Sequence, residues 1–279
     1  MEAKIHKLNS LLEERIKLDQ CLLEQLSKSI LQQAIQGRLV AQVSDDEPAS
    51  ELLKRISEEK ARLIKEKKIK ADKLSSVIFK GDDNKYYEQI GHEVIDLSDE
   101  IPFDIPDSWS WVRLGALVSM SIGKTPSRTS PEYWKEAKYP WVAISDMQTY
   151  GRLNKTKECI SEKGAALLGI PSSAGSLLMS FKLSVGKTVI LDIPAYHNEA
   201  IITISPLCDV DNCIRNYLFL TLPLISQTGD SKDAIKGKTL NSTSLYRLLI
   251  PLPPYNEIRR ISMRVQALFE LLQNPIDLR

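Results

Sequence analysis

The stretch WSWVRLGALV, residues 109–118, is where the character of the chain changes. Short apolar runs that alternate with turn residues follow it, and these runs have the length and composition of β-strands. They are WVAISDM (141–147), SLLMSF (176–181), TVILDI (188–193), AIITIS (200–205) and LLIPLP (248–253). Between them lie two segments typical of short helices, SEKGAALLGI (161–170) and CIRNYLFLTLPLI (213–225). Residues 106–255 are therefore predicted to form a mixed α/β domain.

The segment before this domain, residues 1–75, is predicted to form a helical region. Across residues 4–37 apolar residues recur three, four or seven positions apart with no proline, which is typical of one helix about 50 Å long. Its narrow apolar stripe favours a coiled-coil partner helix, the alternative being a long helix that lies on its own globular domain. A shorter helix is predicted from Pro48 to about Lys70. Its basic end could contact phosphates or could complement the helix dipole in solvent.

Two further segments complete the chain. Residues 76–105 are predicted to be an acidic linker, because residues 76–110 hold 2 basic and 9 acidic residues and the segment ends in a proline-rich stretch. Residues 256–279 return to a helical pattern and are predicted to begin a second long helix. The predicted fold class is α+β, with a mixed α/β domain attached to long coiled-coil-type helices.

Composition excludes several classes of protein. The 279 residues are 43% hydrophobic and 26% charged, which is enough for about two globular domains. No run is long enough to span a membrane, and the first residues do not resemble a signal peptide. The four cysteines form no CxxC pair and the three histidines are far apart, so we expect a cytoplasmic protein with no metal, cofactor or membrane partner.

Charge is distributed unevenly along the chain. Residues 111–255 hold 16 basic and 11 acidic residues, a net charge of +5, whereas the whole chain has a net charge of only +1. A basic globular part behind an acidic segment is compatible with binding to nucleic acid.

The motifs for catalysis are incomplete. GKT occurs at residues 123–125, 186–188 and 237–239, but no glycine stands five residues before any of them, so none forms a P-loop. Residues 252–255, LPPY, resemble the motif of amino-methyltransferases, yet Leu252 cannot grip the amine of a flipped base. Asp107 followed by Glu136-Ala137-Lys138 formally matches a magnesium-dependent nuclease pattern, although this pattern is short and common by chance.

One loop has the composition of a binding element. GKTPSRTS, residues 123–130, combines a turn shaped by glycine and proline with two cationic and several hydroxyl side chains. Such side chains suit contact with phosphates and base edges, and a solvated surface turn is the alternative.

Several stretches in this order resemble the specificity (S) subunit of type I restriction–modification enzymes. LSKSILQQAIQGRLVAQ and the helical segment after it resemble the conserved helical region of that family, and IPDSWSWVRLGALV with GKTPSR…YW resembles the opening of a target-recognition domain. YPWVAISDM, SLLMSFKLSVGKTVI and KGKTLNSTSLYRLLIPLPPYNEIRRI resemble its middle and end. The resemblance covers nearly the whole chain. One departure is Pro253 to Ile258, where the family usually has Pro-Pro-x-x-Glu-Gln.

The resemblance implies a non-catalytic role in defence against foreign DNA. An S subunit carries two target-recognition domains held apart by antiparallel helices, each reading one part of a split double-stranded DNA site. It docks methyltransferase (M) subunits, and the restriction (R) subunit joins through the complex. This chain has one such domain, so it resembles half an S subunit that pairs with itself or with another half. The alternatives are a truncated scaffold, a recombination cassette without DNA readout, or a magnesium-dependent endonuclease.

The resemblance also suggests which residues contact DNA. Asp146 could accept a hydrogen bond from cytosine N4 or could simply cap a turn. The other candidates are cationic, hydroxyl or amide side chains of the recognition domain. The predicted DNA-binding residues are Lys124, Thr125, Ser127, Arg128, Asp146, Lys182, Lys187, Lys236, Lys238, Thr239 and Asn241.

Overall fold

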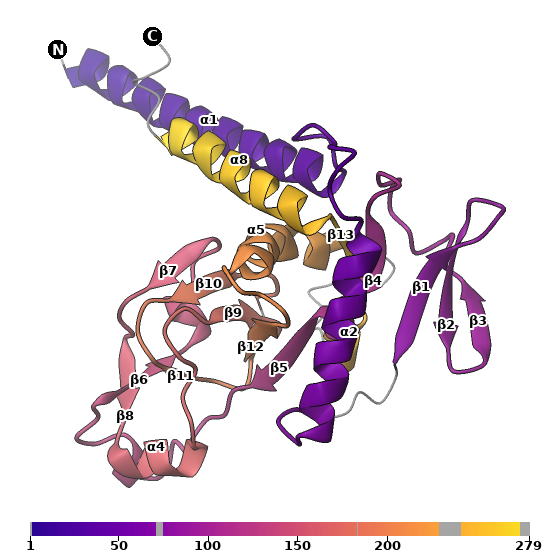
Figure 1. Cartoon of the computed structure of the whole chain (residues 1–279). Helices are drawn as coiled ribbons and strands as arrows, with labels where there is room; N and C mark the ends of the chain where they lie inside the picture. Colours follow the sequence, from indigo (N-terminus) through magenta and orange to yellow (C-terminus); the bar gives the residue numbers. More distant parts are fainter. Residues whose placement is uncertain (1, 71–74, 183, 229–240, 274–279) are drawn as a thin grey trace.

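The computed structural model describes residues 2–70, 75–182, 184–228 and 241–273. Two long helices, α1 (Glu2–Ile35) and α8 (Tyr255–Gln273), lie side by side and antiparallel at one edge of the molecule (Figure 1). A mixed α/β domain lies below them in the view, and α2 (Ala49–Lys65) lies between that domain and a small separate sheet (Figure 1). The predicted α+β fold class is confirmed. No helix in these described ranges is long and apolar enough to cross a membrane.

The α/β domain is built around a five-stranded sheet in the order β5-β12-β9-β10-β7. Its strands pair antiparallel except for β10 and β7, which run parallel. The bounds are β5 (Val118–Ile122), β7 (Gly151–Leu153), β9 (Leu177–Ser180), β10 (Thr188–Leu191) and β12 (Ile201–Pro206). Every residue of β9 and β10 is buried, so these two strands are the centre of the domain. Their sequences are apolar without alternation, apart from Ser180 at the end of β9 and Thr188 at the start of β10.

A second, three-stranded sheet lies at the far end of the domain. Its order is β11-β6-β8, with bounds Tyr139–Val142 for β6, Glu158–Ile160 for β8 and Tyr196–His197 for β11. The short helix α4 (Glu162–Leu168) follows β8 and begins at Ser161, whose hydroxyl accepts a hydrogen bond from the Gly164 amide. This small sheet positions the loops described below.

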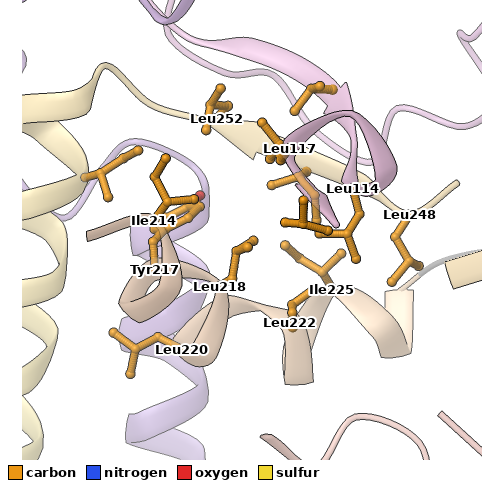
Figure 2. Close-up of a cluster of buried hydrophobic side chains, with 14 of the residues drawn as sticks. Leu114, Leu117, Ile214, Tyr217, Leu218, Leu220, Leu222, Ile225, Leu248 and Leu252 are labelled. Carbon is orange, nitrogen blue, oxygen red and sulfur yellow. The ribbon is translucent and has the colours of Figure 1, made fainter. Parts of the chain in front are cut away.

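One buried cluster joins the domain to its helices. Figure 2 shows α5 (Cys213–Thr228) directing a row of side chains toward α3 (Leu114–Leu117) and β13 (Leu249–Leu252). Burying one such leucine contributes about 1.5–3 kcal/mol. The Tyr217 hydroxyl donates to the Pro251 carbonyl at 2.6 Å, so the polar atom of this buried ring is also satisfied. The residues labelled in the cluster are Leu114, Leu117, Ile214, Tyr217, Leu218, Leu220, Leu222, Ile225, Leu248 and Leu252.

The two ends of the α/β domain pair with each other. β4 (Ser110–Arg113) at its start forms an antiparallel ladder with β13 at its end, with Val112 opposite Ile250. Just outside this ladder Glu257 accepts hydrogen bonds from Trp109 Nε1 at 2.9 Å and from Gln42 Nε2 at 2.6 Å. The ladder and Glu257 therefore tie the segment that follows α1 to the first turn of α8.

Among the residues of α1 whose burial the structure describes, the buried ones lie in the last part of the helix. Leu31, Ala34 and Ile35 pack within the main cluster, in contact with α5 and α8. This end of α1 therefore lies on its own chain, as the alternative expected, and a coiled-coil partner for the rest of α1 stays a prediction. The first two-thirds of α1 leave apolar side chains exposed, and those that are exposed by 39–64% are Leu11, Leu12, Ile16, Leu18, Leu22, Leu23 and Leu26.

The structure corrects the expected acidic linker. Within residues 76–105 an antiparallel sheet forms from β1 (Ser76–Lys80), β2 (Tyr86–Ile90) and β3 (Glu93–Asp96). The excess of acidic residues indicated a solvated linker, but one of these acids, Glu88, lies buried on a β-strand. Side chains of the protein give the Glu88 carboxylate the hydrogen bonds that water would otherwise give it.

Glu88 forms a buried ion pair with Arg113 of β4. The carboxylate accepts from Arg113 Nη2 at 2.5 Å and from Nε at 3.0 Å, and the Ser76 hydroxyl donates to it at 2.6 Å. Burial by itself raises the pKa of Glu88, but the hydrogen bonds from Arg113 and Ser76 outweigh it and hold the pKa below its ordinary value. The pair thus stabilises the fold at neutral pH, and this contribution is lost as the pH falls through the folded-state pKa of Glu88.

We expect Glu88→Ala to lower the free energy of unfolding by about 3 kcal/mol, because Arg113 would remain buried without its main partner. The double variant Glu88→Leu with Arg113→Met should lose much less, since it removes both charges. Unfolding in urea, followed by circular dichroism, measures both. A loss below about 1 kcal/mol in the single variant would contradict this role for the pair.

Candidate nucleic-acid interface

The loop that follows β5 is held against the small three-stranded sheet. Gly123 leaves no room for a side chain, because a Cβ there would lie 2.1 Å from the His197 carbonyl oxygen. The next amide, of Lys124, donates to that same carbonyl at 2.9 Å. The Lys124 carbonyl in turn accepts from Trp141 Nε1 at 3.2 Å. The backbone of the loop is therefore fixed, while the Lys124 side chain is exposed.

Arg128 is the best-anchored side chain of this loop. Its guanidinium lies 3.8 Å from the ring centroid of Trp134 and 4.7 Å from that of Trp141. Both terminal nitrogens donate to Glu158 of β8, at 2.8 and 2.9 Å. This bidentate contact raises the pKa of Arg128 and lowers that of Glu158. A guanidinium group can also donate two hydrogen bonds to a guanine base. In this structure the guanidinium of Arg128 is already bound to Glu158, so Arg128 shapes the loop.

The hydroxyl side chains of the loop also have protein partners. Thr125 donates a hydrogen bond to Glu199, which lies just after β11. The pKa of Glu199 is lowered, chiefly by this bond and also by the positive charges of Lys182 and Arg128. Ser127 hydrogen-bonds Thr129 at 2.9 Å within the loop. The structure thus brings Lys182 close to the four predicted residues of this loop, which are Lys124, Thr125, Ser127 and Arg128.

Asp146 adopts the turn-capping role that was the alternative to base contact. Its carboxylate accepts from the Ala143 amide at 2.9 Å and from the Lys157 amide at 3.2 Å. It lies on the short helix η2 (Ile144–Asp146) that follows β6. Lys187 lies beside this turn, since its Nζ donates to the Met147 carbonyl at 3.2 Å. These two residues form a second group next to the loop after β5.

Of the last predicted group, only Asn241 lies within the described residues. Lys236, Lys238 and Thr239 lie outside the described residues. Asn241 caps the short helix α7 (Ser242–Tyr246), where its side-chain oxygen accepts from the Ser244 amide at 2.8 Å. That helix contacts α3, and the side chain of Asn241 makes its hydrogen bonds with Ser244 rather than with the 123–130 loop.

Sequence reasoning missed several lysines of the same region. They are exposed, make no ion pair within the described residues, and precede β6 or β8 of the small sheet. In the sequence, the available signal for a shared edge was the spacing of these lysines around strands. They are Lys135, Lys138 and Lys155. Lys157 is a fourth exposed lysine there, and its Nζ donates to the Ser145 carbonyl at 3.0 Å.

The missed acidic partners matter as much. Glu158 on β8 and Glu199 just after β11 bind side chains of the loop from about 30 and 75 residues further along the chain, and no local motif indicates them. Trp134 stands in the YW pair that contributed to the family resemblance, and this pair was the available signal for the stacking platform.

The nuclease pattern is not assembled. Asp107 contacts Lys80 of β1, whereas Glu136 lies just before β6, and these two strands are on opposite sides of the molecule (Figure 1). Within the described ranges no cluster of three or more histidine, cysteine or acidic residues could hold a metal ion. What the structure does assemble is a loop held by aromatic rings, with exposed lysines around it.

Comparison with known proteins places this surface in a family. Residues 106–276, more than half of the chain, match the family described as the type I restriction modification DNA specificity domain. The chain belongs to this family. The matched residues include the loop of residues 123–130 and the small three-stranded sheet.

Individual relatives agree with the family. The type I restriction enzyme EcoEI specificity subunit of Escherichia coli is 40% identical over 111 residues, which are 39% of this chain and 16% of the relative. The HindI specificity subunit of Haemophilus influenzae is 29% identical over 181 residues, which are 62% of this chain and 38% of the relative. The crystal structure of the HsdS subunit from Thermoanaerobacter tengcongensis matches with a TM-score of 0.46 at 20% identity, covering 64% of this chain and 43% of that one. The matches thus span less than half the length of each of these relatives.

We expect Arg128→Lys to lower the free energy of unfolding by about 1 kcal/mol, because lysine keeps the charge but loses the bidentate contact and the stacking on tryptophan. Urea unfolding followed by tryptophan fluorescence measures the loss. The matched control is Lys163→Ala, which breaks an exposed ion pair with Glu132 and should cost no more than about 0.5 kcal/mol. An Arg128→Lys variant as stable as the parent chain would argue against the anchoring role.

Proposed function

We propose that this chain reads one half of a split DNA site and delivers a methyltransferase subunit to it, as a half-length specificity subunit. The observation that carries the proposal is the rigid loop of residues 123–130 surrounded by exposed lysines, within a domain of the DNA-specificity family. The basic balance of residues 111–255 supports it, because cations that neutralise phosphates supply most of the affinity for DNA.

The two cationic residues of the loop, Arg128 and Lys124, have different roles. Arg128 is occupied by Glu158 and the tryptophans, so it positions the loop. Lys124 is exposed on a fixed backbone, and its ammonium contacts a phosphate in the proposed complex. Residues of this kind set the register on the duplex, while base readout falls to neighbouring side chains.

A second recognition domain comes from a second half subunit. In α1, Leu12, Ile16, Leu23 and Leu26 form one exposed apolar line, and Leu11, Leu18 and Leu22 form another beside it. A monomer leaves both lines in water, whereas helix pairing with another copy buries them. A two-fold dimer then reads a symmetric, interrupted site, since protein symmetry is mirrored in the DNA.

We expect Lys124→Ala to weaken DNA binding by the complex of this chain with its methyltransferase subunit, and to reduce the salt slope by about 1. Fluorescence anisotropy between 50 and 200 mM salt measures both quantities. Lys17→Ala on α1 is the control, because that lysine is exposed far from the loop. Normal affinity and slope in Lys124→Ala would remove this residue from the DNA interface.

We expect the chain to be a dimer in sedimentation, and Leu18→Glu with Leu22→Glu to make it monomeric, because two charges would enter the shared helix face. Lys17→Glu reverses a charge on the other side of α1 and should leave the dimer intact.

The functional readout is the methylome of a host that lacks type I systems and expresses this chain with its methyltransferase subunit. A symmetric, interrupted motif that disappears in the double variant is the expected result. An associated, soluble pair of proteins with no methylated motif would favour a scaffold without independent DNA readout.

A further inference from the structure

The outer face of the β1–β3 sheet is apolar and exposed. The register places Val77 opposite Gln89 and Phe79 opposite Tyr87, and Val94 opposite Gln89 on the other side, so these side chains share one face. Val77 is 65% exposed, Val94 55% and Phe79 42%. The Phe79 and Tyr87 rings stack with centroids 5.8 Å apart, which gives the face a fixed aromatic surface.

The inner face of the same sheet already anchors it to the protein. Ile78 and Tyr86 pack against the main cluster, and Glu88 pairs with Arg113. Folding of the sheet therefore does not require apolar residues on its outer face, where polar side chains would serve equally well. An exposed apolar patch on a rigid element marks an interaction surface.

Acidic side chains border this patch. Asp83 accepts a hydrogen bond from the Tyr87 hydroxyl at 2.8 Å, and Asp96 stands opposite Tyr87 on the neighbouring strand. One lysine, Lys85, lies 3.7 Å from Asp96, and the segment 76–110 as a whole has 9 acidic and 2 basic residues. This field repels phosphates, so the patch is unsuited to DNA and complements a protein surface with a basic rim.

The position of the patch separates it from the dimer surface. Figure 1 shows the β1–β3 sheet at one side of the molecule and the amino-terminal half of α1 at the opposite side. A second copy held by α1 leaves the sheet open. A different protein is needed to cover it.

We infer that the outer face of the β1–β3 sheet, formed by Val77, Phe79, Tyr87 and Val94, docks an apolar surface with a basic rim on the methyltransferase subunit. This inference rests on the proposed function, because the partner is the subunit with which that function is carried out. It adds a surface outside residues 106–276, the part matched to the specificity family.

The test is the affinity of the purified full chain for its methyltransferase subunit, measured by isothermal titration calorimetry. We expect Val77→Ser with Phe79→Ser to weaken binding at least tenfold, because the centre of the patch loses its apolar contacts. Val94→Lys, a single exposed change that tests the charge of the partner, should also weaken binding at least tenfold. The matched control is Ile170→Ser with Val210→Ser, two apolar residues that are 97% and 94% exposed elsewhere, and it should bind as the parent chain does.

The outcomes distinguish the inference from the proposed function. Parent-like binding by either well-folded patch variant overturns the inference and leaves the function standing. A parent chain that does not bind the methyltransferase subunit overturns the proposed function and the assigned partner together. If the patch variants instead change the dimer equilibrium or the DNA affinity of the chain alone, the occupant is a second copy or DNA, and the inference is wrong.

Discussion

The pairing of β4 with β13 is the constraint on which the rest of the structure depends. These four-residue strands lie at the two ends of the recognition domain, and their ladder brings residues 110–113 and 249–252 together. Because the chain enters and leaves the domain at one place, α1 and α8 are brought side by side and antiparallel (Figure 1). Glu257 reinforces this junction through Trp109 and Gln42, which come from either end of the segment between α1 and β4. A domain inserted between two helices in this way can change its loops without moving the helices.

Two arginines show how the surroundings decide what a cation does. Arg113 is buried and binds Glu88 and Glu100, so it connects the small sheet to the recognition domain. Arg128 is half-exposed and stacks on Trp134 while binding Glu158, so it shapes a loop. In both cases the planar fork of arginine holds a carboxylate by two hydrogen bonds, which lysine cannot do.

Much of the fold could be predicted from periodicity. The long helix, the final helix and the strands near residues 177–180, 188–191, 201–206 and 249–252 lie close to their expected positions, because their apolar spacing is local information. The run 141–147 is a strand only up to Val142, and residues 144–146 form the short helix η2. The linker prediction failed at residues 76–96, where a high acidic content hid short strands. As one of the acidic residues, Glu88 contributed to the prediction of a solvated linker. Its carboxylate can be buried because it binds Arg113, which lies 25 residues away in the sequence.

The candidate site also has features that the sequence predicts and features that depend on the tertiary structure. The sequence by itself determined the family, the basic character of residues 111–255 and the loop of residues 123–130, because composition and ordered motifs are properties of the chain. Only the tertiary structure decided what each side chain does. Asp146 caps a turn, Arg128 is held by Glu158, and Asn241 caps α7. The physical reason is that these roles depend on partners brought from distant strands, and a hydrogen bond across the fold leaves no periodic mark in the sequence.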